Sequence, residues 1–67
     1  MFSIIVNGTI HRLDQPLTLT ELVEQLALTG RRIAVERNGE IVPRSRFGEA
    51  KLDDGDRLEI VVAVGGG

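Results

Sequence analysis

Two Asn-Gly dipeptides constrain the fold more than any other feature, because each marks a tight reversal of the chain. Asn7-Gly8 lies between the β-branched stretch Phe2–Val6 and the stretch Thr9–Leu13. Asparagine and glycine tolerate the positive φ angles that two-residue hairpin turns require. We therefore expect these two stretches to pair as antiparallel strands.

The register of this first hairpin has two possible solutions. A strict two-residue turn pairs Val6 with Thr9, and it places His11 on the same sheet face as Ile4. A one-residue bulge would place Ile10 there instead. The sequence pattern leaves both solutions open.

The second dipeptide, Asn38-Gly39, predicts another hairpin. It would join a strand at Ile33–Arg37 to a short strand at Ile41–Val42. Pro43 follows and has no amide hydrogen to donate, so the short strand should lie at a sheet edge. An irregular stretch, Arg44–Lys51, comes next.

One helix is predicted between the two hairpins, over Leu19–Leu28. Thr18 and Glu21 have the spacing of a capping box, in which each side chain binds the other's free backbone N–H. Gly30 is placed to adopt the left-handed conformation that closes a helix. The apolar positions follow helical spacing and form one stripe: Leu19, Leu22, Val23 and Leu26.

The final predicted strand, Leu58–Val64, is the most continuously apolar segment. Such a run favours a central position with a neighbouring strand on each side. Before it, Asp53-Asp54-Gly55-Asp56 is typical of a tight turn, and Phe47 and Leu52 are expected to pack in the core.

These elements predict an α+β fold of the β-grasp (ubiquitin-like) type. Four to five strands would form a mixed sheet with one helix packed across one face, in a right-handed crossover. The first and last strands would lie side by side and parallel in the centre. We expect residues 1–64 to form this domain and residues 65–67 to form a flexible glycine tail.

Size and composition restrict the classes of function. With 67 residues and a mass of 7.3 kDa, the chain offers little core from which to build an enzyme pocket. It has no cysteine and one histidine, so we expect no bound metal or cofactor. A net charge of −2 argues against nucleic acid as a partner. No segment has the length or leader pattern of a membrane or export signal, and we expect a cytoplasmic protein.

The predicted chemistry lies at the end of the sequence, in Gly65-Gly66-Gly67. Glycine has no Cβ, so such a tail fits a channel too narrow for other residues. Its terminal carboxylate would be ionised at pH 7 and a poor electrophile. A partner that uses ATP would have to convert the carboxylate to a mixed anhydride, because nothing in this chain resembles a phosphate-binding loop.

Over essentially its whole length the sequence resembles the thiamine-biosynthesis sulfur carrier (ThiS) family. The isoleucine-valine-proline-arginine segment and the glycine ending are the most specific parts. The segments that carry the resemblance are Val6-Asn7-Gly8, Ala34-Val35-Glu36-Arg37-Asn38, Ile41-Val42-Pro43-Arg44, Asp54-Gly55-Asp56-Arg57-Leu58-Glu59-Ile60 and Ala63-Val64-Gly65-Gly66-Gly67.

The resemblance implies a sulfur carrier that is not itself an enzyme. Gly67 would be adenylated by an E1-like adenylyltransferase and then converted to a thiocarboxylate, with Gly66 as its required neighbour and Gly65 as a spacer. The implied sulfur source is a cysteine desulfurase or sulfurtransferase, and the implied acceptor is thiazole synthase. The alternatives are a molybdopterin-synthase small subunit with the same tail chemistry and a ubiquitin-like interaction module without it.

A partner interface is predicted from the alternation of the strands. If Leu58 faces the helix, then every second residue from Arg57 faces away from it. Exposed apolar patches with polar rims mark binding sites. We expect an apolar patch beside the tail made of Ile5, Ala34, Val61 and Ala63, rimmed by Glu36, Arg57 and Glu59.

Overall fold

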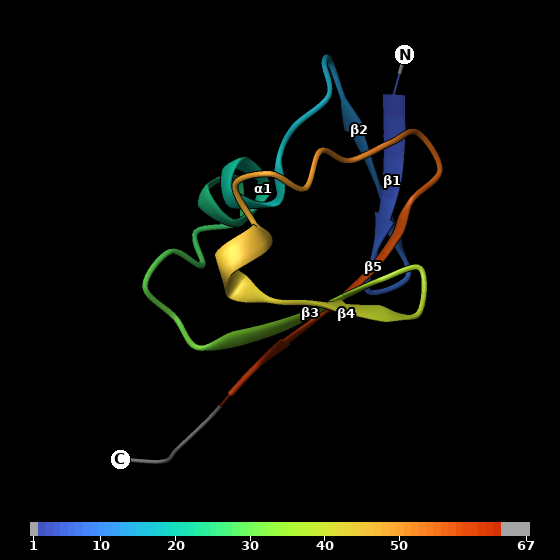
Figure 1. Ribbon diagram of the computed structural model, residues 1–67. Helices are drawn as coiled ribbons and strands as arrows, with labels where there is room; N and C mark the ends of the chain where they lie inside the picture. Colours follow the sequence, from blue (N-terminus) through green and yellow to red (C-terminus); the bar gives the residue numbers. More distant parts are fainter. Residues whose placement is uncertain (1, 64–67) are drawn as a thin grey trace.

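The computed structural model describes residues 2–63, and the fold is a single sheet with one helix against it (Figure 1). Every predicted strand and the predicted helix are present, and the stretch predicted to be irregular begins with a 3-10 helix. In chain order the elements are β1 (Phe2–Val6), β2 (Thr9–Leu13), α1 (Leu19–Gln25), β3 (Ile33–Arg37), β4 (Glu40–Val42), the 3-10 helix η1 (Arg44–Arg46) and β5 (Arg57–Val62).

The five strands form one mixed sheet in the order β2-β1-β5-β3-β4. β1 and β5 are parallel neighbours, and the other adjacent strands are antiparallel. The prediction that the first and last strands lie side by side in the centre is confirmed (Figure 1). β4 is a three-residue edge strand, as the proline that follows it predicts.

The first hairpin has the strict two-residue turn. Val6 pairs with Thr9 and Ile4 with His11, so the bulged alternative is wrong. Asn7 and Gly8 have φ angles of 50° and 83°, which are the left-handed values this turn requires.

The capping box at the start of α1 is present as predicted. The Glu21 N–H donates to the Thr18 hydroxyl at 3.2 Å, and the Thr18 N–H donates to Glu21 Oε1 at 2.9 Å. The helix ends earlier than predicted, at Gln25 rather than Leu28. Ala27, not Gly30, adopts the left-handed conformation that closes it, with a φ of 60°.

This early end has a packing reason. The Leu28 N–H donates to the Val23 carbonyl and the Ala27 N–H to the Glu24 carbonyl, both at 3.0 Å. These two bonds form a Schellman motif, which reverses the chain. The reversal lets Leu28 pack against the core, and Gly30 adopts its own positive φ in the turn that follows.

The core lies between α1 and one face of the sheet. Phe47 and Leu52 are buried in it, as the sequence predicted. They belong to a segment that runs beside the start of α1, where the Leu19 N–H donates to the Ala50 carbonyl. The buried apolar residues are Ile4, Val6, Leu13, Leu17, Leu19, Leu22, Val23, Val35, Phe47, Leu52, Leu58 and Ile60.

Candidate functional site

The predicted tail, Gly65-Gly66-Gly67, and Val64 before it lie outside the described residues. Ala63 is the last residue described, and its N–H donates to the Arg32 carbonyl at 2.9 Å. The sheet therefore holds β5 by backbone hydrogen bonds up to this residue. The surroundings of Ala63 are the part of the body from which the tail would begin.

We call the sheet face away from α1 the open face. Alternation along the strands assigns residues to it, because neighbouring side chains point to opposite faces. The large exposed apolar residues found on it are Ile10, Ile41 and Val61, at 65%, 73% and 62% exposure. Its residues are Ser3, Ile5, Ile10, Arg12, Ala34, Glu36, Ile41, Arg57, Glu59, Val61 and Ala63.

The open face does not form the single apolar patch that was predicted. Ala34 pairs with Val61, so these two residues and Ala63 lie together near the last described residue. Ile5 pairs with Arg57 instead. The parallel register of β1 and β5 is the reason, since it places Ile5 at the start of β5 and not beside Val61.

On the open face of β5, Glu59 lies between Arg57, which is beside Ile5, and Val61, which is beside Ala34. Glu59 pairs with Glu36 of β3. The sequence interpretation missed two apolar members of the open face, Ile10 and Ile41. Ile10 pairs with Ile5, and Ile41 pairs with Glu36. Counting outward from each Asn-Gly turn without a bulge would have placed both residues on this face.

Two asparagine side chains fix β5 in place. Asn7 Oδ1 accepts the Ile60 N–H at 2.8 Å, and Asn7 Nδ2 donates to the Ile60 carbonyl at 3.1 Å. Asn38 Oδ1 accepts the Arg57 N–H at 3.0 Å. Each hairpin turn therefore also holds the backbone of the strand that leads to the tail.

In the aspartate-rich turn, Asp53 and Asp54 are exposed, whereas Asp56 is the centre of a hydrogen-bond network. Asp56 is buried, and its Oδ2 accepts from Arg37 Nε and from the Asp53 N–H, both at 2.8 Å. Its Oδ1 accepts from Asn38 Nδ2 at 3.0 Å. Asp54 Oδ1 accepts the N–H of Ser3 at 2.8 Å, which ties the turn to β1.

The environment of Asp56 shifts its pKa in two opposite directions. Burial raises the pKa because the charged form loses water. Hydrogen bonds from Asp53, Asn38 and Arg37, together with the positive charge of Arg37, lower it by more. The pKa of Asp56 is therefore below its ordinary value, and the carboxylate is ionised at neutral pH.

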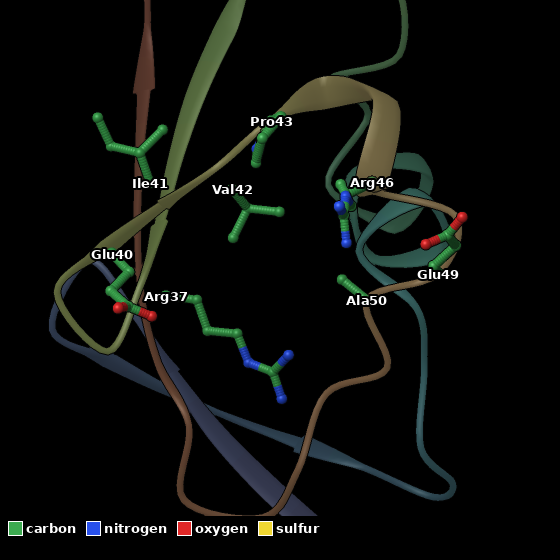
Figure 2. A pocket seen from close by; sticks show the side chains of 8 residues that line it. All are labelled: Arg37, Glu40, Ile41, Val42, Pro43, Arg46, Glu49 and Ala50. Carbon is green, nitrogen blue, oxygen red and sulfur yellow. The ribbon is translucent and has the colours of Figure 1, made fainter.

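A hollow of about 490 Å³ lies between the β3–β4 hairpin and the segment after η1, and Figure 2 shows the side chains that line it. Arg37 reaches into it, but Asp53 and Asp56 already bind that guanidinium. Both arginine and glutamate side chains line its walls. Its lining residues are Arg37, Glu40, Ile41, Val42, Pro43, Arg46, Glu49 and Ala50.

Residues 2–63 contain no group of three or more side chains suited to hold a metal ion. Within the same residues, no helix has the length and apolar character needed to cross a membrane. The candidate site predicted from the sequence consists of the open face and the tail that would begin beside it.

The sequence matches the family model of the ThiS family over residues 4–67. This chain belongs to the ThiS family. The β-grasp fold and the predicted family are both confirmed, because the chain also resembles the crystal structure of a ThiS thiamine biosynthesis protein from Geobacter metallireducens. The TM-score is 0.83 at 33% identity, covering 98% of this chain and 100% of that one.

The curated relatives that this chain matches include a sulfur carrier protein and thiazole synthases. The sulfur carrier protein ThiS of Bacillus subtilis is 42% identical over 50 residues, which cover 75% of this chain and 76% of that protein. A thiazole synthase of Paramagnetospirillum magneticum is 41% identical over 64 residues, which cover 96% of this chain. This chain spans only 20% of the length of that thiazole synthase.

Proposed function

We propose that this ThiS-family chain carries sulfur as a thiocarboxylate on Gly67, for formation of the thiazole ring of thiamine. The observation that supports this proposal most directly is the extent of the family match, which continues through the three glycines to residue 67. Gly66 would be the required neighbour of the modified residue, and Gly65 would be a spacer.

The chemistry takes three steps. The Gly67 carboxylate attacks the α-phosphate of ATP on an E1-like adenylyltransferase, which gives an acyl-adenylate and releases pyrophosphate. In the second step the outer sulfur of a persulfide on a cysteine desulfurase or sulfurtransferase attacks the acyl carbon and displaces AMP. A dithiol reductant then cleaves the resulting acyl disulfide, which leaves the thiocarboxylate on Gly67, returns the enzyme's thiol and oxidises the dithiol to a disulfide. The first step is needed because an ionised carboxylate is a poor electrophile.

In this proposal the chain is a cosubstrate and the partners are the catalysts. The similarity to a thiazole synthase supports thiazole synthase as the acceptor of the sulfur. The same similarity favours the thiazole pathway over the pterin pathway that the sequence left open. ATP is bound and used by the activating partner, not by this chain.

The open face is proposed as the surface that the partners hold. Its exposed apolar residue Val61 lies two positions before Ala63, close to where the tail would begin. The tail and the open face would thus be adjacent. A partner that binds the open face could therefore receive the tail without enclosing the domain.

The test of the tail chemistry is the intact mass of the full chain after incubation with ATP, an E1-like adenylyltransferase, a sulfur source and a dithiol reductant. We expect a mass gain of one sulfur-for-oxygen exchange, located by fragmentation at Gly67. A variant that lacks Gly66 and Gly67 is the control and should not change. The proposal fails if this chain stays unmodified under conditions that convert the Bacillus subtilis sulfur carrier protein.

A further inference from the structure

Two carboxylates face each other at the centre of the open face. Glu36 of β3 and Glu59 of β5 are direct cross-strand partners, and both are exposed. Like charges placed opposite each other destabilise an antiparallel pair. The ion pairs found among residues 2–63 both involve Arg37, so neither glutamate has a cation within bonding distance there.

The two glutamates lie in a hollow rather than on a flat surface. It has a volume of about 530 Å³, and Arg57, Asn38 and Gly39 complete its lining. Arg57 lines it without forming an ion pair with either glutamate. The two carboxylates can both accept charge-assisted hydrogen bonds from one basic side chain that enters the hollow from outside.

Apolar residues border this hollow on two sides. Ile41 is the cross-strand neighbour of Glu36, and Val61 follows Glu59 on the same face of β5. Both are more than 60% exposed, at 73% and 62%. A charged centre with apolar flanks is the complement of a surface that presents one cation among apolar side chains.

We propose that the adenylating partner inserts one arginine or lysine side chain between Glu36 and Glu59 while its apolar residues cover Ile41 and Val61. This proposal rests on the proposed function, because it names what the partner presents to the open face. The glutamate pair lowers the stability of the free carrier, and the partner's cation removes that repulsion on binding.

The proposal predicts that replacing the two glutamates stabilises the free chain but weakens its binding to the adenylating partner. Glu36→Gln and Glu59→Gln, alone and together, should raise the Tm of the free chain because the repulsion is removed. The double variant should raise the KM of the adenylyltransferase for the carrier about tenfold with kcat unchanged. This difference from the unaltered chain should shrink at high ionic strength.

Glu24→Gln is the matched control, since it removes the same charge from exposed α1 and should leave KM unchanged. An unchanged KM in the double variant would overturn the proposal. The proposal would also be overturned if the unaltered chain self-associated and Val61→Asp abolished that self-association. The open face would then bind a second copy of this chain and not the basic side chain of a partner. Failure here is distinguishable from failure of the carrier function, since saturating enzyme would still give the mass gain at Gly67.

Discussion

At the scale of single residues, Ala27 is in a conformation that its side chain disfavours. Its φ of 60° lies in the left-handed region, which costs a residue with a Cβ about 1–2 kcal/mol. The backbone needs this angle there, because the Schellman bonds that end α1 reverse the chain so that Leu28 can reach the core.

Replacing Ala27 by glycine should therefore stabilise the protein. We expect the free energy of unfolding to rise by about 0.5–1 kcal/mol, after allowing for the greater freedom of glycine in the unfolded chain. Urea unfolding at neutral pH would measure the change. The control is Ala34→Gly in β3, where the same replacement should lower stability; a loss of stability on Ala27→Gly would contradict this account.

Asp56 should make stability depend on acid pH. Because its pKa is lower in the folded chain, its carboxylate adds stability above its ordinary pKa of about 3.9, and this contribution is lost as the pH falls through the folded value. Asp56→Asn should cost about 2 kcal/mol at pH 7, and the cost should shrink below about pH 4.

Asp53→Asn is the matched control for this prediction. The Asp53 side chain contacts the same Arg37 but is 82% exposed, so its loss should cost less than about 1 kcal/mol. Urea unfolding of the three proteins between acid and neutral pH measures both effects. A cost of Asp56→Asn that stayed constant over that range would show that ionisation of this carboxylate is not the cause.

At the scale of secondary-structure elements, β5 depends on two turns that precede it in the chain. Asn7 continues the β1–β5 pairing past the end of β1, by binding both backbone groups of Ile60. Asn38 holds the first residue of β5, Arg57. The Asn-Gly turns therefore fix the central strand as well as the hairpins they close.

Asn7→Gly separates these two roles, since glycine keeps the positive φ of the turn but has no side chain. We expect a loss of about 1–2 kcal/mol and faster hydrogen exchange at the Ile60 amide, with the β1–β2 hairpin intact. Asn38→Gly is the matched variant and should expose the Arg57 amide instead. If the Ile60 amide exchanged no faster in Asn7→Gly, the Asn7 side chain would not be what holds β5 at Ile60.

At the scale of the whole molecule, the proposed function divides the chain into a body that partners hold and a tail that reacts. The core lies entirely on the α1 side of the sheet. The open face contributes no residue to that core, so substitutions on it should leave the fold intact. Loss of binding should therefore be possible without loss of folding.

Val61→Asp tests this separation. Val61 is exposed, so the substitution should lower stability by less than about 1 kcal/mol. It should nevertheless reduce adenylation by the E1-like enzyme at limiting carrier, because a charge replaces an apolar contact. Val61→Thr keeps the β-branched shape and should retain most of the activity, and adenylation of Val61→Asp at the unaltered rate would exclude Val61 from the interface.

The sequence by itself determined the five strands and the α-helix, the start of α1 and the central place of β5. These depend on local patterns: the Asn-Gly turns, the Thr18–Glu21 box and the apolar run of the last strand. Turn geometry and side-chain periodicity act over a few residues, so they can be inferred from the chain alone.

Only the tertiary structure decided how distant residues meet. The register of β1 on β5 joins residues about 50 positions apart and separates Ile5 from Val61. The same long-range packing buries Asp56 against Arg37 and places the left-handed residue that closes α1 at Ala27 rather than Gly30. No local pattern encodes these contacts, because each depends on where two segments come to rest in the same core.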